Sequence, residues 1–238
     1  MGRAYFRNQS TRMFENDFLE ACSKVHPAVP VLLYGPFTLG LFGWGLSTGR
    51  TTVGTSVLFV PLGLLTWIAM EYCIHRFFFH WEGNGPITRR VHEIAHGYHH
   101  KYPDDARRLV MPPSASIPLA LLIGGLLWLV GHPAQTLPYF IGIVWGYMTY
   151  DTIHWATHHH TPRTKWGKEL RAHHMAHHFA TPDRNFGISN RWVDILMGSG
   201  GRRSRPSEKR APDRHARPEQ GSGERPCPPL SVPVRENP

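Results

Sequence analysis

The chain has 238 residues, which suits one domain with a tail rather than two separate domains. Its formal net charge of +9 is common among nucleic-acid-binding proteins, but the basic residues lie beside apolar blocks and in a polar tail, which favours anionic lipid and no nucleic-acid partner. The three cysteines form no CxxC pair, which argues against both a zinc ribbon and a disulfide framework.

Four apolar blocks follow a polar N-terminal segment. They cover residues 29–47, 52–69, 115–130 and 137–152. The first two approach the roughly 20 residues that cross a bilayer core, and the short link at Gly49 and Arg50 makes them an antiparallel hairpin. The last two are shorter, which leaves thin spans, tilted spans and re-entrant helices open. The sequence therefore predicts an all-α integral membrane protein with about four transmembrane helices in two hairpins.

The segments outside these blocks are polar. In the N-terminal segment, residues 1–28, a few apolar side chains fall at helical spacing, which fits either a short helix on the membrane surface or a polar leader: Met13, Phe14, Phe18 and Leu19. A run of Pro, Gly, Ser and Arg with almost no apolar residues begins at residue 200. We expect residues 29–199 to form the membrane domain and residues 200–238 to form a disordered basic tail.

The distribution of basic residues predicts the orientation of the chain. The two hairpin tips carry only Arg50, whereas the segment between the hairpins and residues 163–171 carry most of the other basic side chains of the membrane domain. By the positive-inside rule, that side and both termini are cytoplasmic. The same side holds nearly all the histidines, so we expect a cytoplasmic, helical, histidine-rich cap on the bundle.

Ten of the seventeen histidines form four spaced sets. These are His75-x4-His80, His96-x2-His99-His100, His154-x3-His158 and His174-x2-His177-His178. Spacings of three and four place side chains on one face of a helix, so we expect the members of each of the last three sets to converge. A spacing of five does not align, which predicts either that one of the first pair lies beyond a helix end or that a local bulge turns it inward.

Neutral imidazole is a common metal ligand, and ten ligands are too many for one ion with open coordination positions. The four sets therefore predict two metal ions with four or five histidines each. A solvated run of histidines would not explain why each set begins at the edge of an apolar block. His159 and His173 adjoin two of the sets, so their register stays open by one residue.

The histidine sets and the residues around them resemble the fatty acid hydroxylase superfamily, which includes sterol desaturases and carotene hydroxylases, and in particular its fatty acid 2-hydroxylase branch. The resemblance covers about residues 13–199. The matching stretches are Glu71-Tyr-Cys-Ile-His-Arg-Phe-Phe-Phe-His80, His96-Gly-Tyr-His-His-Lys-Tyr-Pro-Asp-Asp105, Arg108-Leu-Val-Met-Pro-Pro113, Tyr150-Asp-Thr-Ile-His-Trp-Ala-Thr-His158, His174-Met-Ala-His-His-Phe179 and Asn185-Phe-Gly-Ile-Ser189.

The resemblance implies an oxidoreductase that hydroxylates a fatty acyl chain at C2 with O2 as co-substrate. It implies a dinuclear non-haem centre, usually iron with zinc as another occupant, on ten ligands: His75, His80, His96, His99, His100, His154, His158, His174, His177 and His178. No fused haem module is visible, so electrons would come from a separate cytochrome b5-like or ferredoxin-like protein. The membrane would be the inner membrane of a bacterium or the endoplasmic reticulum of a eukaryote. The closing Trp192-Val-Asp194 and Gly198-Ser199 depart from the family's Trp-Asp and Gly-Thr.

Several polar residues near the sets are further candidates, and Asp151 and Tyr150 are the predicted catalytic residues. Asp151 lies one turn before His154, and Glu71 lies one turn before His75, so each fits an acceptor for a ligand's second ring nitrogen or a carboxylate at the membrane boundary. Tyr150 and Tyr98 fit either the lining of the site or an aromatic interface belt. The expected contacts of the lipid head group are Asn185, Trp192, Asp104 and Asp105.

Three alternatives to acyl hydroxylation remain. A sterol or carotenoid hydroxylase or desaturase would use the same metal core, because hydroxylation and desaturation share the step that removes hydrogen. A metal transporter is disfavoured, because transporters usually place ligands near the bilayer midplane. An inactive relative is disfavoured by the complete set of candidate ligands.

Overall fold

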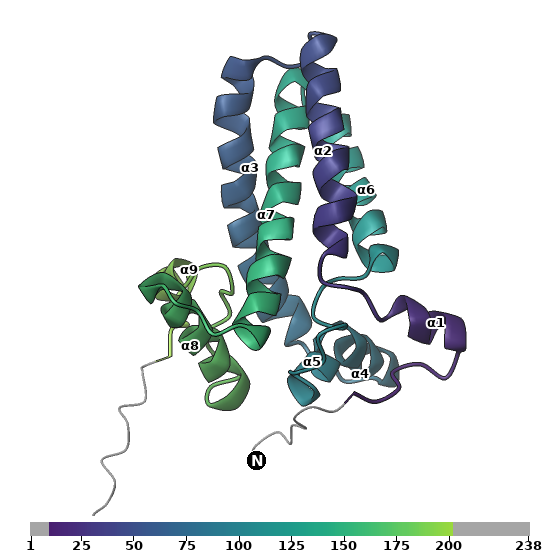
Figure 1. The fold of residues 1–238 in the computed structure, drawn as a ribbon, viewed down its shortest axis with the longest axis vertical. Helices are drawn as coiled ribbons and strands as arrows, with labels where there is room; N and C mark the ends of the chain where they lie inside the picture. Colours follow the sequence, from purple (N-terminus) through teal and green to yellow (C-terminus); the bar gives the residue numbers. More distant parts are fainter. Residues whose placement is uncertain (1–9, 202–238) are drawn as a thin grey trace, which may run out of the picture. The chain divides into compact units, whose positions relative to one another are not determined.

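The computed structural model describes residues 10–201, and every regular element in that range is helical (Figure 1). This confirms the all-α prediction. The first nine residues and residues 202–238, which make up most of the predicted tail, lie outside the described range. The elements are α1 (Asp17–Cys22), α2 (Val29–Ser47), α3 (Val53–Cys73), the π-helix η1 (Ile74–Phe79), α4 (Pro86–His92), the π-helix η2 (Glu93–Gly97), α5 (Tyr98–Lys101), α6 (Pro113–Val130), α7 (Pro133–His159), α8 (Lys165–Phe179) and α9 (Trp192–Leu196).

Three of the described helices are long and apolar enough to cross a membrane: α2, α3 with its continuation η1, and α6. Their outward faces carry exposed leucines such as Leu32, Leu58 and Leu121, as expected for side chains that meet lipid. α7 has 27 residues, a length of about 40 Å, and runs between α2 and α3 (Figure 1). Neighbouring helices cover much of α7, which is why its sequence is less apolar. A fourth span therefore stays a prediction.

The two hairpins close at the upper end of the bundle in Figure 1, where small polar contacts join their tips. Gly49 adopts a positive φ of 67° in the turn between α2 and α3, a conformation that glycine reaches without steric cost. The Thr52 hydroxyl caps α3 by accepting from the Thr55 N–H at 3.1 Å. The Thr51 hydroxyl donates to the Ala134 carbonyl at 2.9 Å, which ties the first hairpin to the start of α7.

α3 and α7 pack closely through two glycines. A Cβ atom built on Gly63 would lie 2.2 Å from the Tyr139 carbonyl oxygen, and one built on Gly142 would lie 2.2 Å from the Val60 carbonyl oxygen. Backbones can approach this closely only where neither residue has a side chain. The Gly63–Gly142 contact therefore fixes the helix pair whose lower ends carry His75, His154 and His158.

We expect Gly142→Ala to lower the free energy of unfolding by about 2 kcal/mol or more, because the added methyl group meets backbone that cannot move aside. Thermal unfolding of the purified protein in detergent measures the change. Gly125→Ala is the matched control, because a Cβ on Gly125 would meet nothing within 4 Å and alanine favours a helix. Equal melting temperatures for the two variants would contradict the close contact.

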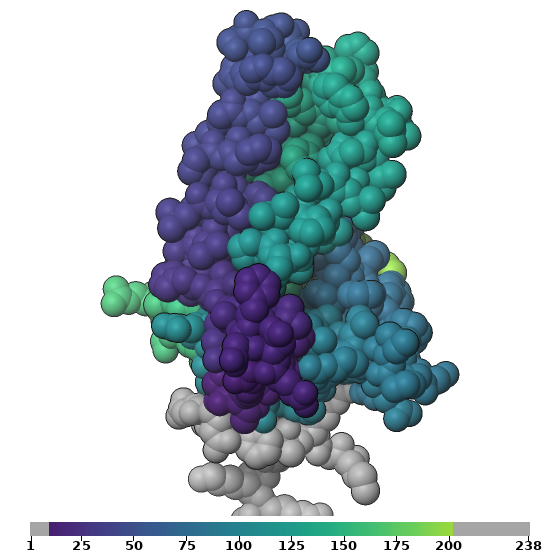
Figure 2. All heavy atoms as spheres, turned by 90° about the vertical axis from the view of Figure 1, so that its right-hand side faces the viewer, coloured from purple at the N-terminus to yellow at the C-terminus, as the bar shows by residue number. Residues whose placement is uncertain are grey.

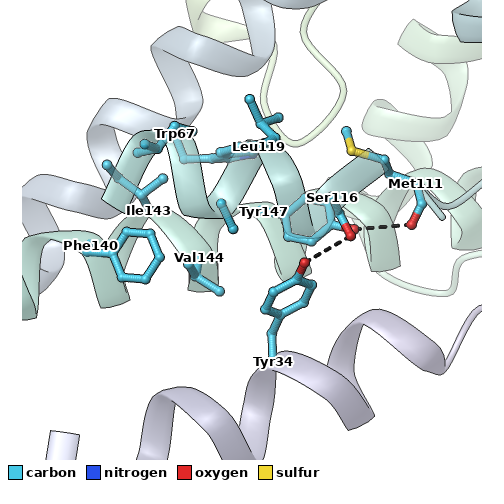
Figure 3. Close-up of a pocket in the computed structure, with 11 residues that line it drawn as sticks. Tyr34, Trp67, Met111, Ser116, Leu119, Phe140, Ile143, Val144 and Tyr147 are labelled. Atoms are coloured by element: carbon cyan, nitrogen blue, oxygen red, sulfur yellow. Dashed lines mark hydrogen bonds between the residues drawn. The ribbon is translucent and has the colours of Figure 1, made fainter. Parts of the chain in front are cut away.

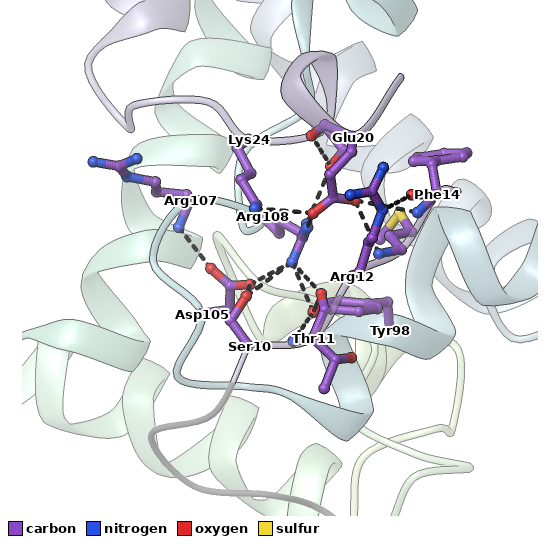
Figure 4. A network of polar contacts seen from close by, with 12 residues as sticks. Ser10, Thr11, Arg12, Phe14, Glu20, Lys24, Tyr98, Asp105, Arg107 and Arg108 are labelled. Carbon is purple, nitrogen blue, oxygen red and sulfur yellow. Dashed lines mark hydrogen bonds and ion pairs between the residues drawn. The ribbon is translucent and has the colours of Figure 1, made fainter. Parts of the chain in front are cut away.

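A polar network holds the N-terminal segment against the segment after α5 (Figure 4). The buried Arg108 guanidinium donates to the Glu20 carboxylate, to Asp105 at 3.0 Å and to the Tyr98 hydroxyl at 2.7 Å. Burial alone would raise the pKa of Glu20, but hydrogen bonds from Lys24, from the Phe14 and Met13 N–H groups and the charge of Arg108 lower it to about 2. Figure 2 shows α1, in purple, below the membrane-spanning helices. Tyr98 thus braces the segment that carries His99 and His100.

Candidate metal centre

The ten histidines of the four sets gather at the lower end of the bundle in two groups of five. Group A contains His75, His80, His96, His100 and His177. Group B contains His99, His154, His158, His174 and His178. Within each group, one ring nitrogen of every member lies within 4.8 Å of all the others. No other chain segment between residues 10 and 201 offers a comparable cluster of three or more candidate ligands.

Each His-x-x-His-His motif is divided between the two groups, so our expectation that each motif converges is wrong. His96 and His100 belong to group A, while His99 belongs to group B. Successive residues of a helix are about 100° apart, so residues four apart share a face and the intervening neighbour points to the side. In α8 the pattern is reversed, because His174 and His178 belong to group B and His177 to group A. Each motif therefore supplies ligands to both sites.

A π-helix brings His75 and His80 together in spite of their spacing of five. η1 spans Ile74–Phe79, and the His80 N–H donates to the His75 carbonyl at 3.3 Å, the i to i+5 pattern of a π-bulge. The ring nitrogens Nε2 of the two histidines lie 3.3 Å apart. The expectation of a local bulge at this pair is confirmed.

The protonation of two ring nitrogens shows that lone pairs converge in group A. His75 Nδ1 lies 2.5 Å from the Phe186 carbonyl oxygen, and His177 Nδ1 lies 2.7 Å from the Arg184 carbonyl oxygen. A carbonyl oxygen only accepts, so each Nδ1 carries the hydrogen and each neutral ring presents a bare Nε2 to the centre. Several Nε2 lone pairs that face one another repel unless a cation lies between them.

The distances between these nitrogens fit one metal ion in each group. Neighbouring Nε2 atoms are 2.9–3.3 Å apart in group A and 2.8–3.1 Å apart in group B. Two imidazole nitrogens at right angles about an ion, each at the usual bond length, are separated by about 3.0 Å. Five such ligands leave a further position open around a six-coordinate ion. The residues present therefore fit a dinuclear centre with open positions, and imidazole suits iron, zinc or copper.

Burial keeps these rings in the neutral form that binds metals. Desolvation, followed by the neighbouring imidazoles, lowers the pKa of His96, His99, His174 and His178 well below the ordinary 6.5. The lone pairs are therefore available to a metal at neutral pH.

We expect acid to release the metals and to destabilise the metal-free chain. Because the folded-state pKa values lie below 6.5, the unfolded chain binds more protons, and the free energy of unfolding falls as the pH drops below about 6.5. The check is metal content per chain after dialysis at pH 7.5 and at pH 5.0, with circular dichroism at both. An unchanged stability of the metal-free chain between pH 7.5 and pH 5.0 would contradict the burial of these histidines in their neutral form.

The loop between α8 and α9 fixes the ligands of group A through its backbone. The fully buried Asp194 accepts from the Phe186 N–H at 2.9 Å, from the Gly187 N–H at 2.7 Å and from the Ser199 hydroxyl at 2.8 Å. His173 Nε2 lies 2.9 Å from the same carboxylate, which is why His173 takes no place in group B. Asp194 thus holds the peptide whose carbonyl orients a ligand of group A.

Glu71 fixes the same loop from the end of α3. Its carboxylate accepts from the Ile188 N–H at 2.8 Å and from the Ser189 N–H and hydroxyl at 2.7 and 2.6 Å. Of the two roles that the sequence left open for Glu71, acceptor for His75 or carboxylate at the membrane boundary, the first is not seen, because a backbone carbonyl holds that ring instead. The sequence carried no signal for this partner, because any residue can supply a carbonyl.

Group B lacks such backbone acceptors among residues 10–201. The buried Nδ1 atoms of His99, His154, His174 and His178 have no hydrogen-bond partner in that range. Asp151, a candidate acceptor for His154 or a carboxylate at the membrane boundary, accepts from the Met111 N–H at 3.3 Å. The two metal positions are therefore supported differently: backbone carbonyls orient two rings of group A, whereas the Nδ1 atoms of these four rings of group B have no partner among residues 10–201.

Of the other predicted site residues, some lie beside the histidines and others lie on the surface or within the loop after α8. Tyr150 is buried, with its ring centroid 5.7 Å from that of His154. Asn185, at a φ of 60°, uses its side chain within the loop, where it accepts from the Gly201 N–H and donates to Thr181. Trp192 points outward from α9, and the charge of Asp104 acts on His159. The structure thus brings Tyr150 to the metal groups and leaves Trp192 on the surface.

An apolar pocket lies between α2, α3, α6 and α7 (Figure 3). Its walls include Trp67, Leu119 and Phe140, and hydroxyl groups mark the end nearer the histidines, where Tyr34 donates to Ser116 at 2.9 Å. Tyr147 lines the same end and donates to the Met111 carbonyl at 3.4 Å. Tyr147 stands two helical turns before His154 on α7, so the pocket leads toward group B.

The chain is similar to several proteins of known activity. Residues 60–199 match the sequence profile of a family described as Fatty acid hydroxylase. A dihydroceramide fatty acyl 2-hydroxylase of Arabidopsis thaliana is 35% identical over 192 residues, 80% of each chain. A fatty acid 2-hydroxylase of Macaca fascicularis is 35% identical, and the match covers 78% of this chain and 55% of that protein.

A solved structure has the same fold. The chain is similar to the visible hydroxylase domain of full-length Scs7p, with a TM-score of 0.73 and 27% sequence identity, covering 78% of this chain and 70% of the other. The ceramide very long chain fatty acid hydroxylase of Schizosaccharomyces pombe is 31% identical, and the match covers 84% of this chain and 57% of the yeast protein. The chain thus spans about half the length of its mammalian and yeast relatives.

Proposed function

The chain belongs to the fatty acid hydroxylase family, and from that premise we propose that it hydroxylates the acyl chain of a fatty acid or ceramide-type lipid at C2. It is an oxidoreductase of the membrane, with helices apolar enough to cross it. The observation that carries the proposal is the convergence of ten histidines in two groups of five at the ends of these helices. Metal ions held there would lie beside the membrane in which a lipid substrate is dissolved.

We propose iron in both groups, with O2 as co-substrate. The chemistry that such a pair supplies when bound is the reductive activation of O2 and the oxidation of an unactivated C–H bond. The chain contributes ten imidazole ligands, most of them buried, and a loop that keeps the rings of His75 and His177 in place. The same imidazole nitrogens can hold zinc, so the identity of the metal is part of the proposal.

The apolar pocket and the residues beneath it form the proposed substrate site. An acyl chain would lie among Leu119, Phe140 and their neighbours, with its carbonyl end toward the hydroxyl groups near Tyr147. Tyr150 and Asp151 would line the reacting end, because they lie between this pocket and His154 on α7. Asp104, Asn185 and Trp192 remain the proposed contacts of the head group.

The proposed function also requires an electron donor and an orientation of the chain in the membrane. A separate cytochrome b5-like or ferredoxin-like protein would deliver two electrons for each turnover. The histidine groups and both termini would face the cytoplasm, since the positive-inside rule places the basic segments around them there. The position of both groups at helix ends rather than near mid-span disfavours the transporter alternative.

The test combines metal analysis with lipid mass spectrometry of cells that express the wild type or His99→Ala. We expect about two metal ions per wild-type chain and 2-hydroxy acyl lipids that are absent with His99→Ala. His26→Ala is the control, because His26 is exposed and belongs to neither group. A changed sterol or carotenoid profile would refute acyl hydroxylation and keep the metal core. A wild-type chain without metal after a metal-replete preparation would refute the dinuclear centre.

A further inference from the structure

Helix α9 presents a cluster of large apolar side chains to its surroundings. Leu196 is 83% exposed and Trp192 is 68% exposed, while Ile195 and Met197 are more than half exposed. Single exposed apolar residues are ordinary, but four within six consecutive residues mark an interaction surface. We call these four residues the α9 patch.

The α9 patch is held rigidly rather than left loose. Between its members, Asp194 points inward and is fully buried by the contacts described above. The Ser199 hydroxyl, just after the patch, contacts the Tyr72 hydroxyl of α3 at 2.7 Å. Arg191, just before it, pairs with Glu169 of α8 at 3.3 Å. The fold thus uses the polar residues of this segment as anchors and directs the apolar ones outward.

The height of α9 relative to the spans indicates what the patch meets. Figure 1 places α9 beside the lower end of α3, whereas α4 and α5 lie farther from the spans. α9 packs against α3, whose outward face carries the exposed Leu58 and Leu65 and continues into the exposed Phe77 of η1. The apolar surface that the spans offer to lipid therefore continues onto α9.

The sequence around the patch is basic. Arg184 and Arg191 precede it, and the sequence that follows Gly201 carries five more basic residues within nine positions: Arg202, Arg203, Arg205, Lys209 and Arg210. Apolar side chains beside basic residues are the composition of segments that bind the interface of an anionic bilayer. A docking surface for an acidic protein would instead present its basic groups without the protruding apolar side chains.

We propose that the α9 patch inserts into the headgroup–acyl boundary of the bilayer, favours anionic lipid, and seats the loop of residues 184–201 against the membrane. That loop supplies the carbonyl groups that orient His75 and His177. Contact with the bilayer therefore supports metal group A from outside, and this inference does not depend on the reaction that the metals perform.

The first test measures membrane depth at Leu196. The native cysteines are replaced by serine or alanine, and a nitroxide is attached at Leu196→Cys. One labelled chain is reconstituted in each nanodisc, which contains phosphatidylcholine with or without phosphatidylglycerol. Arg89→Cys is the control, since Arg89 is exposed on α4, farther from the spans. We expect the label at position 196 to collide several-fold less with a water-soluble nickel chelate and several-fold more with O2 than the label at position 89.

The outcomes separate the possible occupants of the patch. Equal collision rates at the two positions would overturn membrane insertion. Protection from the chelate without increased contact with O2 would show that protein rather than lipid covers the patch and would also overturn the proposal. Equal depth with and without phosphatidylglycerol would overturn the preference for anionic lipid.

A second measurement uses the protein's own tryptophans and needs no attached label. Lipids brominated near the headgroup quench tryptophans that lie at the interface, and Trp192→Phe is expected to remove a measurable share of that quenching. Trp155→Phe is the matched control, because Trp155 lies among the helices near His159 and His160. An identical loss of quenching in both variants, or none in Trp192→Phe, would overturn the proposal.

Discussion

Replacing His174 with alanine is expected to leave about one metal ion per chain and to reduce hydroxylation more than about 100-fold. His174 is fully buried, and its Nε2 lies 2.8 Å from His158 Nε2 and 3.1 Å from His178 Nε2 within group B. Removal of a residue that only supports a ligand already costs about 10–100-fold in metal affinity or activity, and removal of the ligand itself costs more. Metal analysis and 2-hydroxy lipid yield measure the two effects.

His177→Ala is the matched variant, because His177 lies only three residues away on α8 but belongs to group A. We expect each variant to retain the metal ion that the other loses. X-ray absorption of iron-loaded protein, or chelator titration of the remaining ion, distinguishes the two sites. Loss of the same ion in both variants would contradict the division of the motif between the groups. His160→Ala, an exposed neighbour of the third set, should retain both metals.

Asp194→Ala is expected to lower the melting temperature and to weaken metal binding in group A by about 10–100-fold. Burial would raise the pKa of Asp194, but hydrogen bonds from His173, Gly187, Ser199 and Phe186 lower it below 3.8, so the group is charged at neutral pH. Without this carboxylate, the buried N–H and O–H groups that donate to it lose their acceptor. Each donor left unpaired costs about 1–3 kcal/mol. The Phe186 carbonyl then loses its fixed position beneath His75.

Competition with a chelator tests this effect, with the release of each ion followed separately. We expect the ion of group A to leave first from Asp194→Ala, while the ion of group B leaves at nearly the wild-type rate. Asp183→Ala is the control, because Asp183 is an exposed carboxylate of the preceding loop. Simultaneous loss of both ions would show that Asp194 supports only overall stability and would contradict a specific role toward His75.

The sequence predicted the helical architecture well because hydrophobic pattern and turn residues act locally. The apolar block at 29–47 coincides with α2, and the block at 115–130 lies within α6. The block at 52–69 was too short, because α3 and η1 carry the helix on to Phe79 through residues that include Glu71 and His75. In the sequence, the polar side chains of Glu71 and His75 indicate the end of an apolar block. In the fold, the loop of residues 184–201 covers both of them.

The sequence by itself identified the ten histidines that gather at the ends of the helices, because their spacing and their position beside the apolar blocks are local properties of the chain. Only the tertiary structure decided how His99 and His177 leave their own motifs to join the opposite group. That choice depends on where α5 and α8 face each other, which no local pattern encodes. The same is true of the carbonyl groups of Arg184 and Phe186, because backbone acceptors are identical at every residue and acquire a role only through the positions that the fold gives them.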